Sequence, residues 1–206
     1  MEVTTDFANL LQSFDLPALD DQPATIIGTW PDLTLAFTNK AWATFSSLNG
    51  GHRDRLQLGI CIFDAIPEAL LPFYREHFQE VIREDKPWEH EYECSSPEAF
   101  RLFHMLVYPV SHGQGLLMIH SLRRESAHDR LPPSLRGEYR DKDGFVHQCA
   151  HCRRTRRCDD HRVWDWIPDF VRTPQLNTSH GLCDVCYAYY YREERQVFPS
   201  PLSTVQ

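Results

Sequence analysis

Apolar and polar side chains alternate most clearly over residues 88–94. One face of a strand there would carry Trp88, His90, Tyr92 and Cys94, and the other face three glutamates. A period of two is typical of a half-buried β-strand. Turn residues after Cys94 and Val110 divide the apolar stretch that follows, which predicts two more strands over 100–110 and 116–122.

Helical spacing marks three other segments. Residues 67–83 carry apolar side chains every three or four positions and have a proline near each end, so we expect one long helix. Residues 41–45 predict a short helix, and a loop rich in glycine and arginine is expected over 49–55. In the first 22 residues an amphipathic helix interrupted by Pro17 is predicted from the spacing of Phe7, Leu10, Leu11 and Phe14.

Two shorter apolar runs, at 26–30 and 33–38, lie between the N-terminal helix and the short helix at 41–45, and a Pro-Asp turn separates them. Together with the three later strands they make five. The pattern therefore predicts an α+β fold with a five-stranded antiparallel sheet and helices on one face.

The composition of the sequence changes after residue 125. Residues 126–144 contain Pro-Pro and Asp-Gly pairs and little periodicity, which marks a linker. Five of the seven cysteines follow within 145–195, which predicts a small separate module. Residues 196–206 carry no charge and are expected to be disordered. The expected organisation is a helical cap (1–21), a main domain (22–125), the linker, the module and the tail.

The charge balance excludes some classes of function. The 206 residues include 21 basic and 29 acidic side chains, a net charge of -8, which disfavours binding of nucleic acid over the whole surface. No Lys or Arg precedes Lys40, and no apolar run approaches the ~18 residues of a membrane span. We expect a cytoplasmic protein without a secretory leader, in which thiols are reduced or metal-bound.

Two C-x-x-C pairs, Cys149/Cys152 and Cys183/Cys186, are separated by 30 residues. Each pair can supply half of a tetrahedral zinc shell. The gap is longer than the ~15–20 residues of a simple zinc ribbon, but the entropy of closing a loop rises only logarithmically with its length. We predict a structural zinc site with these four ligands, which would stabilise a segment too small for a large core.

Other ligand sets stay open, because further histidines and a cysteine lie nearby: His147, His151, His180 and Cys158. Cys158 is the expected unliganded thiol. A thioredoxin-like redox pair is disfavoured because no βαβ pattern surrounds either motif.

The order strand, strand, short helix, loop, long helix and three strands over about 22–124 resembles the PAS sensor domain, in the branch found in bacterial histidine kinases. The resemblance is carried by Thr38-Asn39-Lys40-Ala41-Trp42, Lys86 to Cys94, Phe100-Arg101-Leu102-Phe103, Pro109 and Leu117-Met118-Ile119-His120. It implies a scaffold that holds a ligand between sheet and helices, or that pairs with a protein partner.

The same resemblance bears on two possible cofactors, flavin and haem. Flavin photochemistry is disfavoured because Cys61 lacks the surrounding pattern of photoreactive members. Haem is disfavoured although His77 lies on the long helix, since its register matches poorly. Cys94 and His120 face each other across the predicted sheet, where we expect a buried thiol and a hydrogen-bonded core histidine rather than metal ligands.

The cysteine module resembles a short cysteine-rich tail of some bacterial signalling proteins. The shared pattern is Cys149-x-x-Cys152-Arg153-Arg154-x-Arg156, then Trp164 and Trp166, then Ser179-His180-Gly181-Leu182-Cys183-x-x-Cys186 with tyrosines after it. Asp184 and the insert at Cys158 depart from it, so Cys158 inherits no role. The aromatic residues, including Tyr189 to Tyr191, are interpreted as the core of the module or its seam against the main domain.

The one basic cluster is Arg153, Arg154, Arg156 and Arg157. We favour its pairing with nearby aspartates (Asp159, Asp160, Asp165 and Asp169) over a grip on phosphate.

No catalytic motif is present, and four cysteines would leave a zinc ion without an open position. The sequence thus predicts a non-enzymatic sensor or signalling protein. Its expected partners are a small ligand, another protein, or a second copy paired through the N-terminal helix and the main domain. The alternatives are a nucleic-acid-binding regulator that uses Arg153–Arg157, and a zinc-thiolate redox switch.

Overall fold

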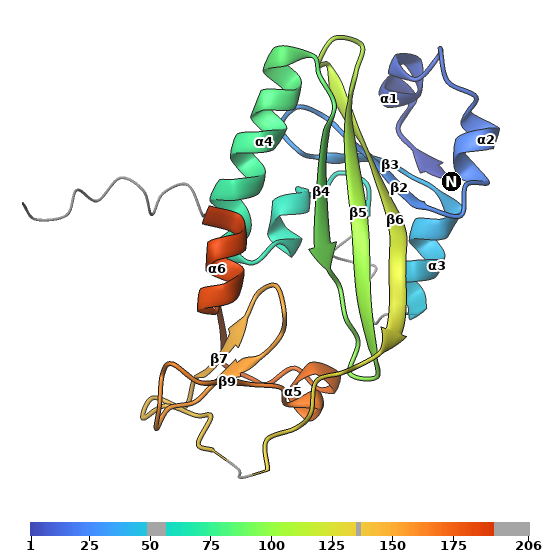
Figure 1. Cartoon of the computed structure of the whole chain (residues 1–206). Helices are drawn as coiled ribbons and strands as arrows, with labels where there is room; N and C mark the ends of the chain where they lie inside the picture. Colours follow the sequence, from blue (N-terminus) through green and yellow to red (C-terminus); the bar gives the residue numbers. More distant parts are fainter. Residues whose placement is uncertain (49–56, 135–136, 192–206) are drawn as a thin grey trace, which may run out of the picture.

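The computed structural model of the protein describes residues 1–48, 57–134 and 137–191. The predicted loop at 49–55 and the predicted tail at 196–206 lie outside these residues. A six-stranded antiparallel sheet forms the main domain, in the order β1-β3-β2-β6-β5-β4 (Figure 1). Its strands are β1 (Glu2–Val3), β2 (Thr25–Thr29), β3 (Leu35–Thr38), β4 (Trp88–Glu93), β5 (Ala99–Val110) and β6 (Gly115–Ala127).

The mixed α+β architecture is as predicted, but the strand count is six rather than five. The added strand is β1, which pairs Glu2 with Thr38 and Val3 with Phe37 at the sheet edge. A strand of two residues has no period that a sequence could display. The other five strands coincide with the predicted runs, and β6 continues to Ala127 beyond the predicted end at 122.

One face of the sheet is covered by α3 (Lys40–Leu48), the 3-10 turns η2 (Ile62–Ala65) and η3 (Glu68–Leu70), and α4 (Leu71–Glu84). The long helix predicted over 67–83 is confirmed as η3 followed by α4. Tyr74, Phe78 and Val81 of α4 are buried with Met105 and Met118 of the sheet. The helix ends at Asp85, whose φ of 54° is left-handed.

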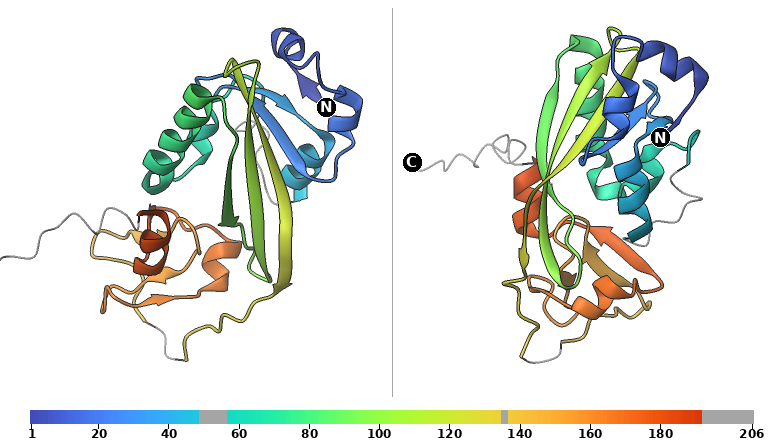
Figure 2. Two further views of the ribbon diagram at one scale, coloured as in Figure 1. Left: turned by 45° about the horizontal axis from the view of Figure 1, so that its top comes forward. Right: turned by 90° about the vertical axis from the view of Figure 1, so that its right-hand side faces the viewer.

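The opposite face is covered by the N-terminal segment, which forms α1 (Thr5–Leu10) and α2 (Leu16–Asp20), visible in Figure 2. Phe7 and Leu11 are fully buried there. Pro17 does not interrupt a helix but lies in the first turn of α2, where its missing N–H costs no hydrogen bond. Phe7 and Leu11 are thus buried within their own chain, whereas Phe14 is exposed, and pairing of two copies through this segment stays a prediction.

The asparagine of the PAS resemblance joins three parts of this domain. Asn39 Oδ1 accepts hydrogen bonds from Ile26 N and Trp42 N, both at 3.0 Å. Its Nδ2 donates to the carbonyl of Ala24 at 2.9 Å. A single buried side chain therefore holds β2 against the start of α3.

The C-terminal module has a small sheet in the order β10-β7-β8-β9 and two helices (Figure 1). Its elements are β7 (Val146–Cys149), β8 (Thr155–Arg156), β9 (Trp164–Asp165), α5 (Pro168–Arg172), β10 (Thr178–Gly181) and α6 (Asp184–Tyr191). Among the described helices of the chain, none combines the length and apolar character needed to cross a bilayer.

The helix α6 packs directly against the main domain, beside the start of α4 (Figure 1). Tyr190 lies in the same buried cluster as the α4 residues, with its ring 4.9 Å from that of Phe73. Tyr191 donates its hydroxyl to Ala69 O at 2.9 Å, and Tyr189 donates to Glu91 O at 2.7 Å. The interpretation of these tyrosines as a seam is confirmed.

Candidate metal centre and adjoining cavity

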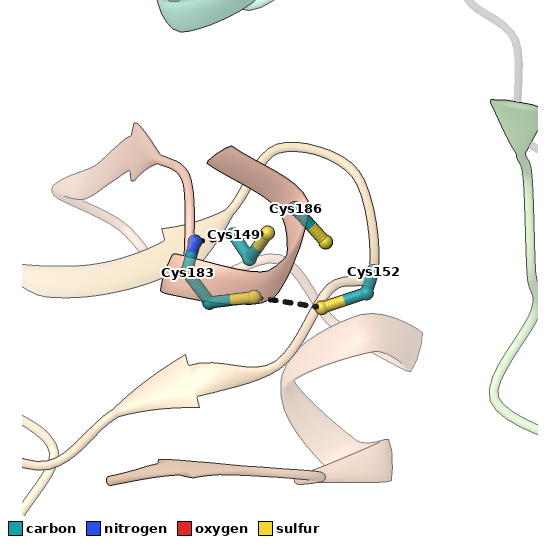
Figure 3. A group of neighbouring side chains, drawn as sticks. All are labelled: Cys149, Cys152, Cys183 and Cys186. Atoms are coloured by element: carbon teal, nitrogen blue, oxygen red, sulfur yellow. Dashed lines mark hydrogen bonds between the residues drawn. The ribbon is translucent and has the colours of Figure 1, made fainter. Parts of the chain in front are cut away.

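The structure brings the two C-x-x-C pairs together. One sulfur atom from each of Cys149, Cys152, Cys183 and Cys186 lies within 4.8 Å of all the others, and all four side chains are buried (Figure 3). Parallel pairing of β10 with β7 causes this meeting, because it sets Gly181 opposite Cys149. The second pair then begins α6, and the first closes a turn in which Arg153 N donates to Cys149 O at 3.1 Å.

The spacing of the sulfur atoms fits zinc. Zinc–sulfur bonds of about 2.3 Å in a tetrahedron place the sulfur atoms about 3.8 Å apart. Cys152 Sγ and Cys183 Sγ are separated by 3.8 Å, which is far longer than the ~2.0 Å of a disulfide. The amide of Cys183 also donates to Cys149 Sγ at 3.4 Å, which favours the thiolate form of that sulfur.

The mutual contacts of the sulfur atoms also shift their acidity. Hydrogen bonding from Cys152 lowers the pKa of Cys149 to about 7, and hydrogen bonding with Cys149 lowers the pKa of Cys183 to about 7. Hydrogen bonds to the other three sulfur atoms raise the pKa of Cys186. Several buried thiolates within one cluster repel one another, so the arrangement favours a bound cation.

The side chains considered as alternative metal ligands form other interactions. His147 Nε2 is 2.9 Å from Asp141 Oδ2, and His151 Nδ1 is 2.8 Å from the hydroxyl of Tyr190. Within the described part of the chain, the four cysteines are the one group of three or more side chains placed to share a metal ion, and His180 and Cys158 are outside it.

A cavity of about 400 Å³ adjoins the metal centre. Most of its wall is apolar and comes from the sheet and from the helices of the main domain, including Ile27, Leu35, Trp42, Phe78, Met105 and Met118. The remaining wall comes from the cysteine module: Ala150, His151, Arg153 and Tyr190. The first C-x-x-C turn and α6 therefore close a pocket that the main domain begins.

A polar region of the cavity lies near the end of β4. The Tyr92 hydroxyl is 2.9 Å from His120 Nδ1, which confirms the expected hydrogen bond of this histidine. Burial lowers the pKa of His120 to about 4 and keeps the ring neutral. Cys94 lines the cavity too, but the prediction of a buried thiol was wrong, because β4 ends at Glu93 and Cys94 is exposed.

A buried ion pair joins the two parts of the chain beside this polar region. Arg130 donates from Nη1 to Glu93 Oε1 at 2.7 Å and from Nη2 to Oε2 at 2.5 Å. Its Nη1 also donates to Cys152 O at 2.9 Å, and its guanidinium lies 5.2 Å from the centre of the Trp166 ring. Burial alone would raise the pKa of Glu93, but the hydrogen bonds from Arg130 hold it below its usual value.

Sequence reasoning missed this pair. Alternation placed Glu93 with the exposed glutamates of β4, and Arg130 lay in the predicted linker. The partners are 37 positions apart, so no local pattern links them.

The arginines of the predicted basic cluster have different surroundings in the structure. Arg157 Nε is paired with Asp165 Oδ2 at 2.5 Å, whereas Arg153 lines the cavity. The predicted pairing with nearby aspartates is thus confirmed for Arg157.

The side chains weighed for flavin and haem lie elsewhere. Cys61 precedes η2 and forms a β-bridge with Thr34, and His77 stacks on Trp88 with ring centres 4.5 Å apart. Neither is among the described residues that line the cavity.

No protein-family model matches the sequence, and no curated protein matches it. Similar solved structures include the photoactive yellow protein domain of the sensor histidine kinase Ppr from Rhodospirillum centenum, 11% identical, covering 54% of this chain and 95% of that chain with a TM-score of 0.38. The PAS domain of BvgS from Bordetella pertussis is 17% identical over 58% of this chain and 88% of that chain, with a TM-score of 0.43. A PAS domain of a two-component sensor histidine kinase is 13% identical over 56% of this chain and 99% of that chain, with a TM-score of 0.36. Two of these three solved structures are described as PAS domains, and each match covers little more than half of this chain.

Proposed function

We propose that the chain is a non-enzymatic sensor that binds a small molecule in the cavity and changes the docking of its zinc-holding module in response. The observation that carries this proposal is that one cavity is lined by both parts of the chain. A ligand there would touch the sheet, α4 and the first C-x-x-C turn at once.

The proposed role of zinc is structural. The four buried sulfur atoms would fill a tetrahedral shell around the ion and leave no open position for a substrate or an activated water. The module has short strands and little core of its own, so the metal would supply much of its stability. The turn that carries Arg153 and Ala150 would then be a rigid part of the cavity wall.

The cavity suits a small ligand. Its volume of about 400 Å³ lies within the ~300–1,000 Å³ of small-molecule sites, and its wall is mainly apolar with a few polar groups. A ligand that binds the docked arrangement better than the loosened one shifts the population between them by its difference in affinity. That shift would be the signal passed to a partner.

Binding of the neutral fluorescent probe N-phenyl-1-naphthylamine to the zinc-loaded chain tests the proposal. We expect saturable binding at one site, lost when Met118→Trp fills the cavity. The matched control is Leu122→Trp, the same change to tryptophan at an exposed position of the same strand, which should bind as the natural chain does. Equal binding by the folded Met118 variant, or none by the natural chain, would contradict the proposal.

Hydrogen exchange measures the response of the module in the same samples. The amides of Ala150 and Arg153 are hydrogen bonded within the module, to Gly181 O and Cys149 O. Bound probe should slow their exchange, because it favours the docked arrangement. Unchanged exchange in this turn with the probe bound would show a cavity without a signalling role.

A further inference from the structure

The part of the cavity wall that belongs to the module carries an unpaired charge. Arg153 lines the cavity, and its Nε is buried with no hydrogen-bond partner among the described residues. The one carboxylate in the described lining, that of Glu93, is paired through both oxygens with Arg130. The Glu93–Arg130 pair is neutral overall, so Arg153 leaves the cavity with a net positive group.

The backbone at Arg153 points to a use for its side chain. Its φ of 63° is left-handed, a conformation that favours glycine and strains residues with a Cβ. Glycine would fit this turn after Cys152 without strain. Five other non-glycine residues of the described chain have a positive φ, so the strain at Arg153 is an observation that supports the proposal only beside its cavity position and its unpartnered Nε.

A second polar atom without a partner lies in the part of the cavity lining that comes from the main domain. His120 Nδ1 is occupied by the Tyr92 hydroxyl, and His120 Nε2 is buried without a hydrogen bond among the described residues. Buried polar atoms without partners are costly, so a site that holds two of them suits a ligand with a polar end. The apolar remainder of the wall suits a ligand with an apolar body.

We propose that the ligand is an organic anion with an apolar body and one carboxylate, and that the carboxylate pairs with the guanidinium of Arg153. This inference rests on the proposed function and names the chemical class of its ligand. A guanidinium binds a carboxylate through two parallel N–H···O bonds, and an apolar surrounding strengthens the pair. Because Arg153 follows the ligand Cys152 directly, the bound anion would connect the core of the main domain to the metal centre.

Competition against N-phenyl-1-naphthylamine tests this inference with a matched pair of ligands. The acid 1-naphthylacetate and the amide 1-naphthylacetamide share an aromatic body and differ in charge. For the natural chain we expect the acid to displace the probe at a concentration at least tenfold lower than the amide. In Arg153→Gln the two should be equal, and Arg153→Lys should keep part of the preference, because lysine keeps the charge without the two-pronged geometry.

Arg154→Gln is the control, because it removes the same charge one position along from a residue outside the described cavity lining. It should keep the full preference for the acid. Arg153→Gly, which suits the left-handed turn, repeats the test if the glutamine variant does not fold.

Zinc content measured on every variant separates the remaining explanations. Loss of zinc from both Arg153→Gln and Arg153→Gly would overturn the inference and assign the guanidinium to the thiolates. Equal displacement by acid and amide in the natural chain would overturn it too, while binding of the neutral probe would leave the proposed cavity function standing. Absence of binding by all three compounds would refute the proposed function itself.

Discussion

Replacing Glu93 by glutamine should cost the protein much of its stability. The carboxylate and the Arg130 guanidinium have side chains only 5% and 10% exposed, and two hydrogen bonds join them. Glutamine keeps the size but removes the charge, which leaves a buried guanidinium uncompensated. Removal of one partner of such a pair costs about 3–5 kcal/mol, a large share of the ~5–15 kcal/mol of a typical domain.

Equilibrium unfolding in urea at pH 7 with zinc present, followed by tryptophan fluorescence, measures this cost. The chain offers a matched control in a second ion pair between the two parts of the molecule, Arg172 Nη2 to Glu98 Oε1 at 2.9 Å. Its side chains are 55% and 65% exposed. Glu98→Gln should change the free energy of unfolding by at most about 1 kcal/mol. The double change Glu93→Leu with Arg130→Met should cost less than Glu93→Gln alone, because it leaves no unpaired charge.

A Glu93→Gln variant no more destabilised than Glu98→Gln would contradict this prediction. So would a double variant whose loss of stability equals the sum of the losses of Glu93→Leu and Arg130→Met, since that would mean the two side chains do not act as a pair.

Three further predictions follow from other contacts. Cys152→Ser should abolish zinc binding and speed hydrogen exchange in α6, whereas Cys158→Ser should keep the metal; equal zinc content in the two would contradict the ligand assignment. Gly28→Ala should destabilise the chain by about 1–3 kcal/mol, because the new Cβ would lie 2.5 Å from the Phe7 ring, and the cost should shrink in a Phe7→Ala background if α1 covers this face. Folding keeps His120 neutral with a pKa of about 4, against ~6.5 when unfolded, so its contribution is present above pH 6.5 and is lost as the pH falls. The free energy of unfolding of the natural chain, relative to that of His120→Gln, should therefore fall by about 3 kcal/mol between pH 7 and pH 4, and parallel pH profiles would refute the burial argument.

Local periodicity was sufficient for much of the fold. The alternation from Trp88 to Tyr92 and the helical spacing of α4 each express burial of one face, which the sequence displays directly. The same rule failed at Glu93, where a partner distant in the sequence makes burial of a charge favourable. The strand β1 was missed because two residues carry no period.

The candidate site, too, was predictable from the sequence only in part. The spacing of the four cysteines was enough to predict that they meet, because a C-x-x-C turn aims both of its thiols at one point. The shared cavity was not predictable, since it arises where α6 and the first C-x-x-C turn dock on the main domain. Docking of this kind depends on the complementary shapes of the two surfaces, which a sequence pattern does not display. In the sequence, Arg153 is one of four arginines in a basic run, and nothing there distinguishes its left-handed backbone or its place in the cavity wall.

X-ray absorption at the zinc edge on the purified chain tests the metal centre that supports this account. One zinc per chain with four sulfur neighbours at about 2.3 Å, and no nitrogen or oxygen in the first shell, is the predicted result. A shell that contains a histidine nitrogen or water, or a chain that binds no zinc, would contradict the account and remove the rigid wall from which the cavity argument begins.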